Sequence, residues 1–122
     1  MCGLIFERLA NQAMESGMDA IWMKMRAHTD NIANYSTPGY KSKKVNFHEV
    51  YESVSESQPG KMVLRATVST DENTEARVDG NNVNMEYEQL ELWKAQAQYA
   101  ALTSKINSDY TNLRTVINTF SK

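Results

Sequence analysis

No glycine or proline follows Gly80 in this chain of 122 residues, so nothing in its last third interrupts a long helix. Asn84 is a suitable N-cap, and Glu86 and Glu88 suit a first turn, where the helix dipole favours acidic side chains. We therefore expect one helix over residues 85–122, roughly 50 Å long. Apolar residues recur in it at spacings of three and four, and the stripe changes phase once. Its members are Leu90, Trp93, Ala97 and Ala100, followed after the change of phase by Tyr99, Leu102, Ile106, Tyr110, Leu113, Ile117 and Phe120.

The N-terminal region, residues 1–35, has the same helical pattern. Its stripe alternates spacings of four and three, as in the seam of a coiled coil. Gly17 interrupts the stripe and costs about 1 kcal/mol relative to alanine in a helix interior. We therefore expect a kink, or a break into two helices, near Ser16 and Gly17. The predicted seam residues of this region are Met14, Met18, Ile21, Met25, His28 and Ile32.

The middle region, residues 36–84, is different in kind. Pro38 and Gly39 end the first helix and favour a type II turn, in which Gly39 takes a positive φ. Residues 62–69 alternate in the partial pattern of a strand, and the apolar residues between Val45 and Val54 indicate a short element of undetermined type. We expect residues 69–75 to form a polar, mobile segment. Two more turns are indicated by Gln58-Pro59-Gly60 and by Asp79-Gly80-Asn81-Asn82.

These regions predict a mainly α protein of one domain, residues 1–122. The two terminal helices should pair as a coiled-coil-like hairpin, joined by a middle segment of loop and short β structure. Two helices bury only a limited core, and aromatic residues fall on several of their faces. We therefore expect a subunit that completes its core by assembling with other molecules. The aromatic residues concerned are Trp22, Tyr87, Trp93, Tyr99 and Tyr110.

The sequence offers little support for catalysis, cofactor binding or nucleic-acid binding. The net charge is −2, and a chain of that charge has no strong field for nucleic acid or an anionic membrane. Cys2 is the single cysteine, and the two histidines, His28 and His48, lack the spacing of metal ligands. His28 lies on the predicted seam and is best explained as a packed core residue. We expect no catalytic residue, no metal and no cofactor.

One string of residues carries a specific resemblance. It lies at the end of the N-terminal helix and combines an NIAN element with a TPGY turn. It is similar to the signature of flagellar rod, hook and hook-associated axial proteins. The string is Asn31-Ile32-Ala33-Asn34-Tyr35-Ser36-Thr37-Pro38-Gly39-Tyr40-Lys41.

A second string narrows the resemblance to the FlgB type of flagellar basal-body rod protein. Asp79-Gly80-Asn81-Asn82-Val83 resembles the element that precedes the C-terminal helix in that family. Tyr99 resembles a tyrosine in the middle of the same helix. The sequence departs from the family at Ala95, where asparagine is common, and near Asp71, where histidine is frequent. The resemblance extends from about Met18 to Ile117.

The resemblance implies an axial structural subunit of the proximal rod, and not an enzyme. Such subunits leave the cytoplasm through the flagellar type III export apparatus, which fits the lack of a recognisable signal peptide. They then assemble helically in the periplasm, transmit torque and enclose the export channel. The implied partners are copies of itself, rod proteins of the FlgC, FlgF and FlgG types, the adaptor FliE and the membrane ring. Two alternatives remain open: another axial rod protein, such as the FlgC type, or an unrelated helical adaptor.

Overall fold

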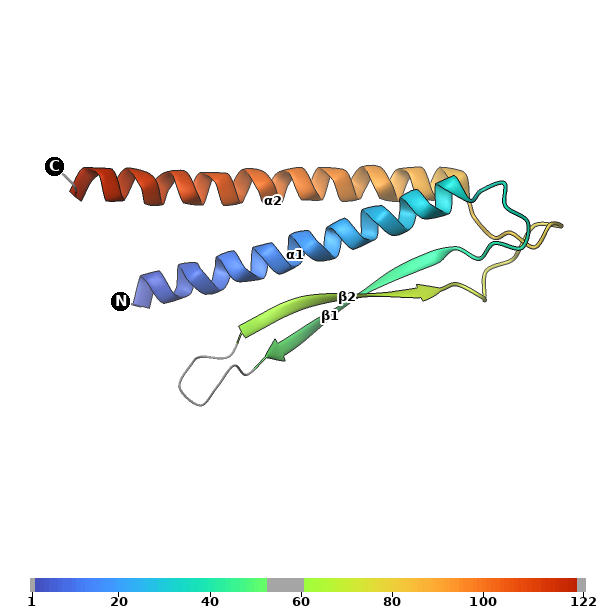
Figure 1. Ribbon diagram of the computed structural model, residues 1–122, viewed down its shortest axis with the longest axis horizontal. Helices are drawn as coiled ribbons and strands as arrows, with labels where there is room; N and C mark the ends of the chain where they lie inside the picture. The colour runs from blue at the N-terminus through green and yellow to red at the C-terminus, as the bar shows by residue number, and fades with distance from the viewer. Residues whose placement is uncertain (1, 53–60, 121–122) are drawn as a thin grey trace.

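The computed structural model describes residues 2–52 and 61–120. It contains two long helices, α1 (Cys2–Ala33) and α2 (Met85–Phe120), and two strands, β1 (Lys43–Glu52) and β2 (Lys61–Thr70). The helices run antiparallel, so the two chain ends lie at the same end of the molecule (Figure 1). The predicted fold class, a mainly helical chain with a short β segment between two long helices, is confirmed.

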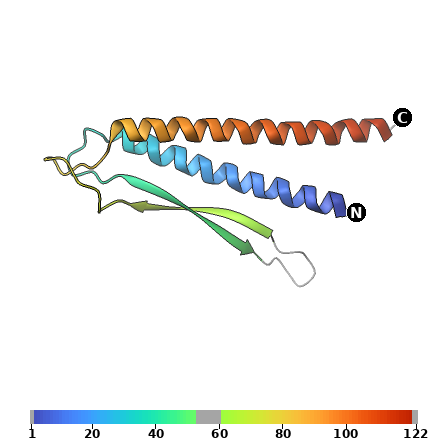
Figure 2. The same cartoon turned by 180° about the vertical axis from the view of Figure 1, so that it is seen from behind.

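Helix α1 forms the middle layer of the molecule. Helix α2 lies along one side of it and the β-hairpin along the other, and both views show the same order (Figures 1 and 2). Among the described elements, the strands contact α1 and each other but not α2. The helices lie closest at the end where the chain turns and diverge toward their free ends (Figure 1). Among the described helices and strands, α1 alone therefore covers α2, and it does so on one face.

The predicted kink near Gly17 is wrong, because α1 is one unbroken helix of 32 residues. Gly17 faces α2, where a Cβ added to it would lie 3.8 Å from the Leu102 side chain. The neighbouring Ser16 hydroxyl donates to the Ala13 carbonyl and accepts from the Leu64 backbone N–H. A glycine cost of about 1 kcal/mol is small beside the packing of α1 between two other layers.

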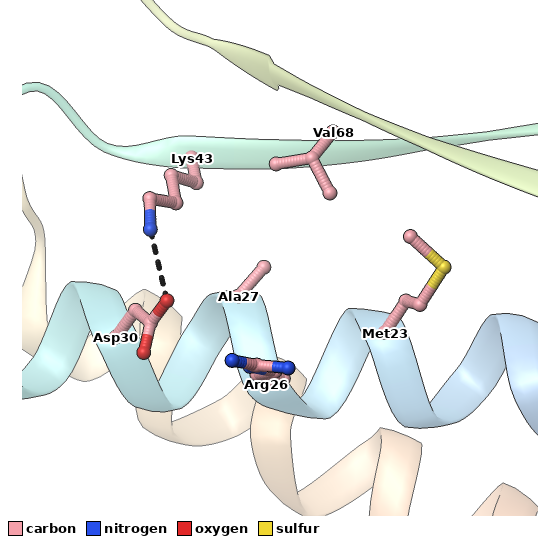
Figure 3. A pocket seen from close by; sticks show the side chains of 6 residues that line it. All are labelled: Met23, Arg26, Ala27, Asp30, Lys43 and Val68. Carbon is pink, nitrogen blue, oxygen red and sulfur yellow. Dashed lines mark hydrogen bonds and ion pairs between the residues drawn. The ribbon is translucent and has the colours of Figure 1, made fainter.

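The strand pattern predicted at residues 62–69 is part of a longer antiparallel hairpin. Val45 pairs with Val68 and Phe47 with Ala66, so these four side chains share one face of the sheet. Figure 3 shows Val68 directed toward α1, so this apolar face is turned toward the helix, while Val68 and Phe47 stay 48% and 41% exposed. The other face is polar, with cross-strand hydrogen bonds from Asn46 to Ser69 and between His48 and Thr67. The turn predicted at residues 58–60 and the predicted apolar residue Val54 lie outside the described residues.

The buried core of the described residues is thin and unusually polar. Its buried hydrophobic residues are small: Ala20, Ala27, Val83 and Ala95. The fully buried side chains of greatest volume are both asparagines, Asn31 and Asn81. Large apolar side chains on the outer helix faces, by contrast, stay exposed. The stability of a soluble monomer does not require such exposure. Seven buried residues are polar or charged: His28, Asn31, Ser42, Asp71, Asn81, Asn82 and Glu88.

Candidate functional site

The two motif strings meet at the closed end of the molecule, where the chain leaves α1 and enters α2 (Figure 1). We call this region the junction; it comprises residues 28–44 and 71–88. The Gly39 N–H donates to the Asp79 carbonyl at 2.8 Å. Gly39 and Gly80 both have positive φ, 71° and 82°. A Cβ added to Gly80 would lie 3.4 Å from the Gly39 Cα, so the two glycines pack backbone against backbone.

Gly39 is the left-handed residue of the predicted turn. Its φ of 71° follows Pro38, and the Tyr40 N–H donates back to the Thr37 carbonyl at 3.3 Å. This matches a type II turn with proline and glycine in the two central positions. The predicted positive φ of Gly39 is confirmed.

Asn81 fixes the loop after α1 to the segment before α2. Its side-chain N–H groups donate to three carbonyls, those of Asn34 at 2.9 Å, Tyr35 at 3.1 Å and Thr37 at 2.9 Å. Its Oδ1 accepts from the Val83 N–H at 2.8 Å. The residue is fully buried, so one side chain supplies the partners that these backbone groups would otherwise lack.

Asn31 performs a similar task for the start of the β-hairpin. Its Oδ1 accepts from the Lys43 N–H and its Nδ2 donates to the Lys43 carbonyl, both at 2.8 Å. The side chain thus pairs with a strand residue much as a neighbouring strand would. The Tyr40 hydroxyl also donates to Asn31 Oδ1, at 3.3 Å. Asn34, by contrast, satisfies a helix carbonyl, through a bond from its Nδ2 to the Asp30 carbonyl.

A buried hydrogen-bonded pair of side chains links the two helices at the junction. Glu88 of α2 lies 2.5 Å from His28 Nδ1 and accepts from Asn31 Nδ2 at 3.0 Å. Only 4% of Glu88 and 8% of His28 is exposed. A buried carboxylate without partners would strongly destabilise the fold, so His28 and Asn31 are needed to hold it. Glu88 therefore does more than interact favourably with the helix dipole.

An ion pair lies one turn further along the helices. Glu91 of α2 bonds to Lys24 of α1 at 2.9 Å and to Lys94 at 2.7 Å. These two lysines, Lys24 foremost, lower the pKa of Glu91 to about 2. The carboxylate therefore stays ionised down to strongly acidic pH and helps to set the register between the helices.

Asp71 anchors the segment that follows β2. Its backbone N–H donates to the Ser42 carbonyl at 2.8 Å, and its own carbonyl accepts from Asn82 Nδ2 at 2.7 Å. Its carboxylate pairs with Lys44 at 2.5 Å and accepts from the Thr74 hydroxyl. Lys44 and then Thr74 hold the pKa of Asp71 well below its usual range. The prediction of a polar, mobile segment here is wrong for Asp71, which is buried.

The remaining motif residues form the outer shell of the junction. Asn84 caps α2, because its Oδ1 accepts from the Tyr87 N–H at 3.2 Å, as predicted. The Arg77 guanidinium lies 4.2 Å from the centre of the Tyr35 ring and donates to the Tyr35 carbonyl. Val83 is buried, Ile32, Asn34 and Tyr40 are partly buried, and Ala33, Thr37, Pro38 and Asp79 are exposed.

The predicted seam residues fall into two sets. Met14, Met18, Ile21, Met25, Tyr99, Leu102, Ile106 and Leu113 are partly buried. Leu90, Trp93 and Ile117 are 50%, 69% and 66% exposed, so they do not lie between α1 and α2. Glu88 and Ala95 are buried on that face of α2 instead. A role for the three exposed residues at an interface with another molecule stays a prediction.

Neither a metal site nor a membrane-spanning helix is present in the part of the chain that the structure describes. No group of three or more histidine, cysteine or acidic side chains there is arranged to hold a metal ion. Neither helix, over its described residues, is both long enough and apolar enough to span a bilayer. The chemically distinctive features of the described residues are therefore the hydrogen-bonded junction and the exposed apolar helix faces.

Comparison with known proteins places this architecture in a family. No protein-family model matches the chain. The flagellar basal body rod protein FlgB of Bacillus subtilis (strain 168) is 32% identical over 117 residues, which cover 87% of this chain and 91% of the relative. Because 87% of the chain is covered, the likeness includes the junction and parts of both helices. The chain belongs to the FlgB family of flagellar basal body rod proteins.

Proposed function

We propose that this chain is a structural subunit of the proximal rod of the flagellar basal body, where it assembles helically with copies of itself and with other rod proteins. The observation that carries the proposal is the relationship to FlgB over most of the chain. The exposed apolar side chains of α2 support it, because a monomer leaves them in water and a packed rod would cover them. The proposed role requires no catalysis.

The finer parts of the proposal concern the place and the neighbours of the subunit. The chain would leave the cytoplasm through the flagellar type III export apparatus and assemble in the periplasm above the membrane ring. There it would line the export channel and transmit torque. Its neighbours would be rod proteins of the FlgC, FlgF and FlgG types and the adaptor FliE. A thin core and long unbroken helices suit a subunit that packs side by side with others.

Deletion of the gene in the source bacterium tests the proposal. We expect the deletion strain to lack rods and filaments and to be non-motile. A plasmid copy should restore swimming, and so should a control copy that carries Asn112→Ala on the exposed surface of α2. Electron microscopy of isolated basal bodies is the measurement. Normal rods and normal swimming in the deletion strain would overturn the proposal.

A further inference from the structure

The exposed apolar residues near the start of α2 form a regular stripe that its own chain leaves uncovered. Leu90, Trp93, Ala97 and Ala100 follow one another at spacings of three, four and three, which is the pattern of a helix seam. They lie on the side of α2 opposite Glu88 and Ala95, which face α1. We call these four residues the outer stripe. Among the described elements, α1 alone contacts α2, so none of the described helices and strands covers the outer stripe.

A groove between α1 and the β-hairpin has a mainly apolar lining, as the outer stripe is apolar. Two hollows lie along it and share Met23. The smaller, of about 270 Å³, is lined by Met23, Arg26, Ala27, Asp30, Lys43 and Val68. Figure 3 shows Lys43 and Val68 facing the α1 side chains across this hollow. The larger, of about 420 Å³, begins at Ser16 and includes Ala20 and Leu64.

We propose that the outer stripe of one copy docks in this groove of a second copy, with the Trp93 side chain in the smaller hollow. The inference rests on the proposed function, because it names the surfaces through which rod subunits meet. A water molecule occupies about 30 Å³ in the liquid, so the smaller hollow has room for roughly nine non-hydrogen atoms, which is the size of an indole ring system. Trp93 is 69% exposed and is the largest side chain of the stripe.

The two surfaces also match in length. The stripe with the adjoining Glu86 spans fifteen residues to Ala100, and the helix side of the groove spans fifteen residues from Ser16 to Asp30, about 22 Å in each case.

The polar groups that line the smaller hollow suit an indole. The Arg26 guanidinium can lie over the face of the ring, a favourable cation–π arrangement. The Asp30 carboxylate, held 2.9 Å from Lys43 Nζ, can accept the indole N–H. A large aromatic anchor in a pocket with polar groups at its edge is the usual form of an interface hot spot.

The stripe and the groove are different surfaces of one molecule, which determines the kind of assembly. Each copy would use its stripe on one neighbour and its groove on another. Such a heterologous contact does not pair two copies into a closed dimer, and it continues into a ring or an open helix. A helical rod needs a heterologous contact that continues into an open helix.

Photo-crosslinking in growing cells is the first test. A photoreactive phenylalanine analogue replaces Trp93 in the full chain, which is expressed together with an isotope-labelled wild-type copy, and basal bodies are isolated after illumination. We expect crosslinks between copies that map to residues 23–30 or to Val68. Crosslinks to another face, to another protein or to nothing would overturn the docking. A chain that enters the rod but crosslinks elsewhere would leave the proposed function intact, whereas failure of the deletion experiment overturns that function itself.

Mixing two variants tests the polarity of the contact. Trp93→Ala removes the anchor and Val68→Arg places a charge at the hollow, and the two replaced side chains are 69% and 48% exposed. We expect each to weaken self-association of the purified chain by at least about tenfold in sedimentation velocity. An equimolar mixture should form dimers and nothing larger. The Val68→Arg variant keeps an intact stripe and the Trp93→Ala variant keeps an intact groove, so one contact of this kind can form between them. Trp22→Ala, at an exposed tryptophan outside both surfaces, should associate as the wild type does. Normal association of Val68→Arg, or a mixture that stays monomeric, would overturn the proposal.

Discussion

Replacing Asn81 by alanine should strongly destabilise the monomer, because this one buried side chain serves four backbone groups of the junction. The change removes the two side-chain N–H groups, which three carbonyls share, and the oxygen that accepts from the Val83 N–H. Each such bond contributes roughly 1 kcal/mol net, and a buried group left without a partner costs about 1–3 kcal/mol. With some water entering the space, we expect the free energy of unfolding to fall by about 3–4 kcal/mol.

Urea denaturation followed by circular dichroism at a helix wavelength measures this loss. With a slope of about 2 kcal/mol per molar urea, the midpoint should fall by about 1.5–2 M at an unchanged slope. Asn112→Ala is the matched control, because Asn112 lies exposed on α2 and its truncation should change stability by less than about 0.5 kcal/mol.

Asn81→Asp separates the role of the donors from that of the acceptor. The aspartate keeps an oxygen for the Val83 N–H but turns a carboxylate oxygen toward the carbonyls of Asn34, Tyr35 and Thr37. We expect it to be at least as destabilising as alanine. A loss below about 1 kcal/mol for Asn81→Ala, or an aspartate variant clearly more stable than the alanine one, would refute the reasoning.

Three further predictions concern the junction and its surroundings. Gly80→Ala should cost about 1–2 kcal/mol in the same assay, because φ is 82° and the new Cβ meets Gly39 at 3.4 Å; an unchanged midpoint would contradict this. Glu88→Ala should cost about 3 kcal/mol or more, since it leaves buried His28 and Asn31 without their acceptor, and a wild-type melting temperature would count against that role. On acidification the chain should lose stability from about pH 4 downward. The pKa of Asp71 and that of Glu91 are lowered in the folded state, so their contribution is present above the unfolded pKa and is lost as the pH falls through the folded one. Thermal melts between pH 6 and 2 measure this, and a flat profile would exclude it.

The helices and the turn at Gly39 were predictable because their signals are local. The lack of glycine and proline after Gly80, the Asn84 cap and the Pro38-Gly39 pair each act within a few residues. The continuity of α1 through Gly17 was not predictable in this way. It depends on packing against Leu102, a residue far along the chain.

The face of α2 that meets α1 could not be chosen from the sequence. Two stripes with helix-seam spacing run along the helix, and the one with Leu90 and Trp93 is the more apolar near the N-terminal end. The structure buries the stripe that contains Glu88, because His28 and Asn31 supply partners for its carboxylate. A histidine on the predicted seam of the first helix and an acid seven residues before Ala95 were the available signals. Their pairing across some sixty residues cannot be read from spacing alone.

The central claim is that the hydrogen bonds of the junction are complete in the free chain, whereas the outer helix faces become buried only against neighbouring molecules. Hydrogen–deuterium exchange on the free chain and on isolated rods tests this directly. The account predicts slow exchange in both samples for the backbone amides of Lys43 and Val83. These amides donate within the chain, to the side-chain oxygens of Asn31 and Asn81. It predicts fast exchange in the free chain and slow exchange in the rod for the end of α2 beyond Leu113, where the described side chains are exposed. Equal protection of that end in the free chain and in the rod would contradict the claim.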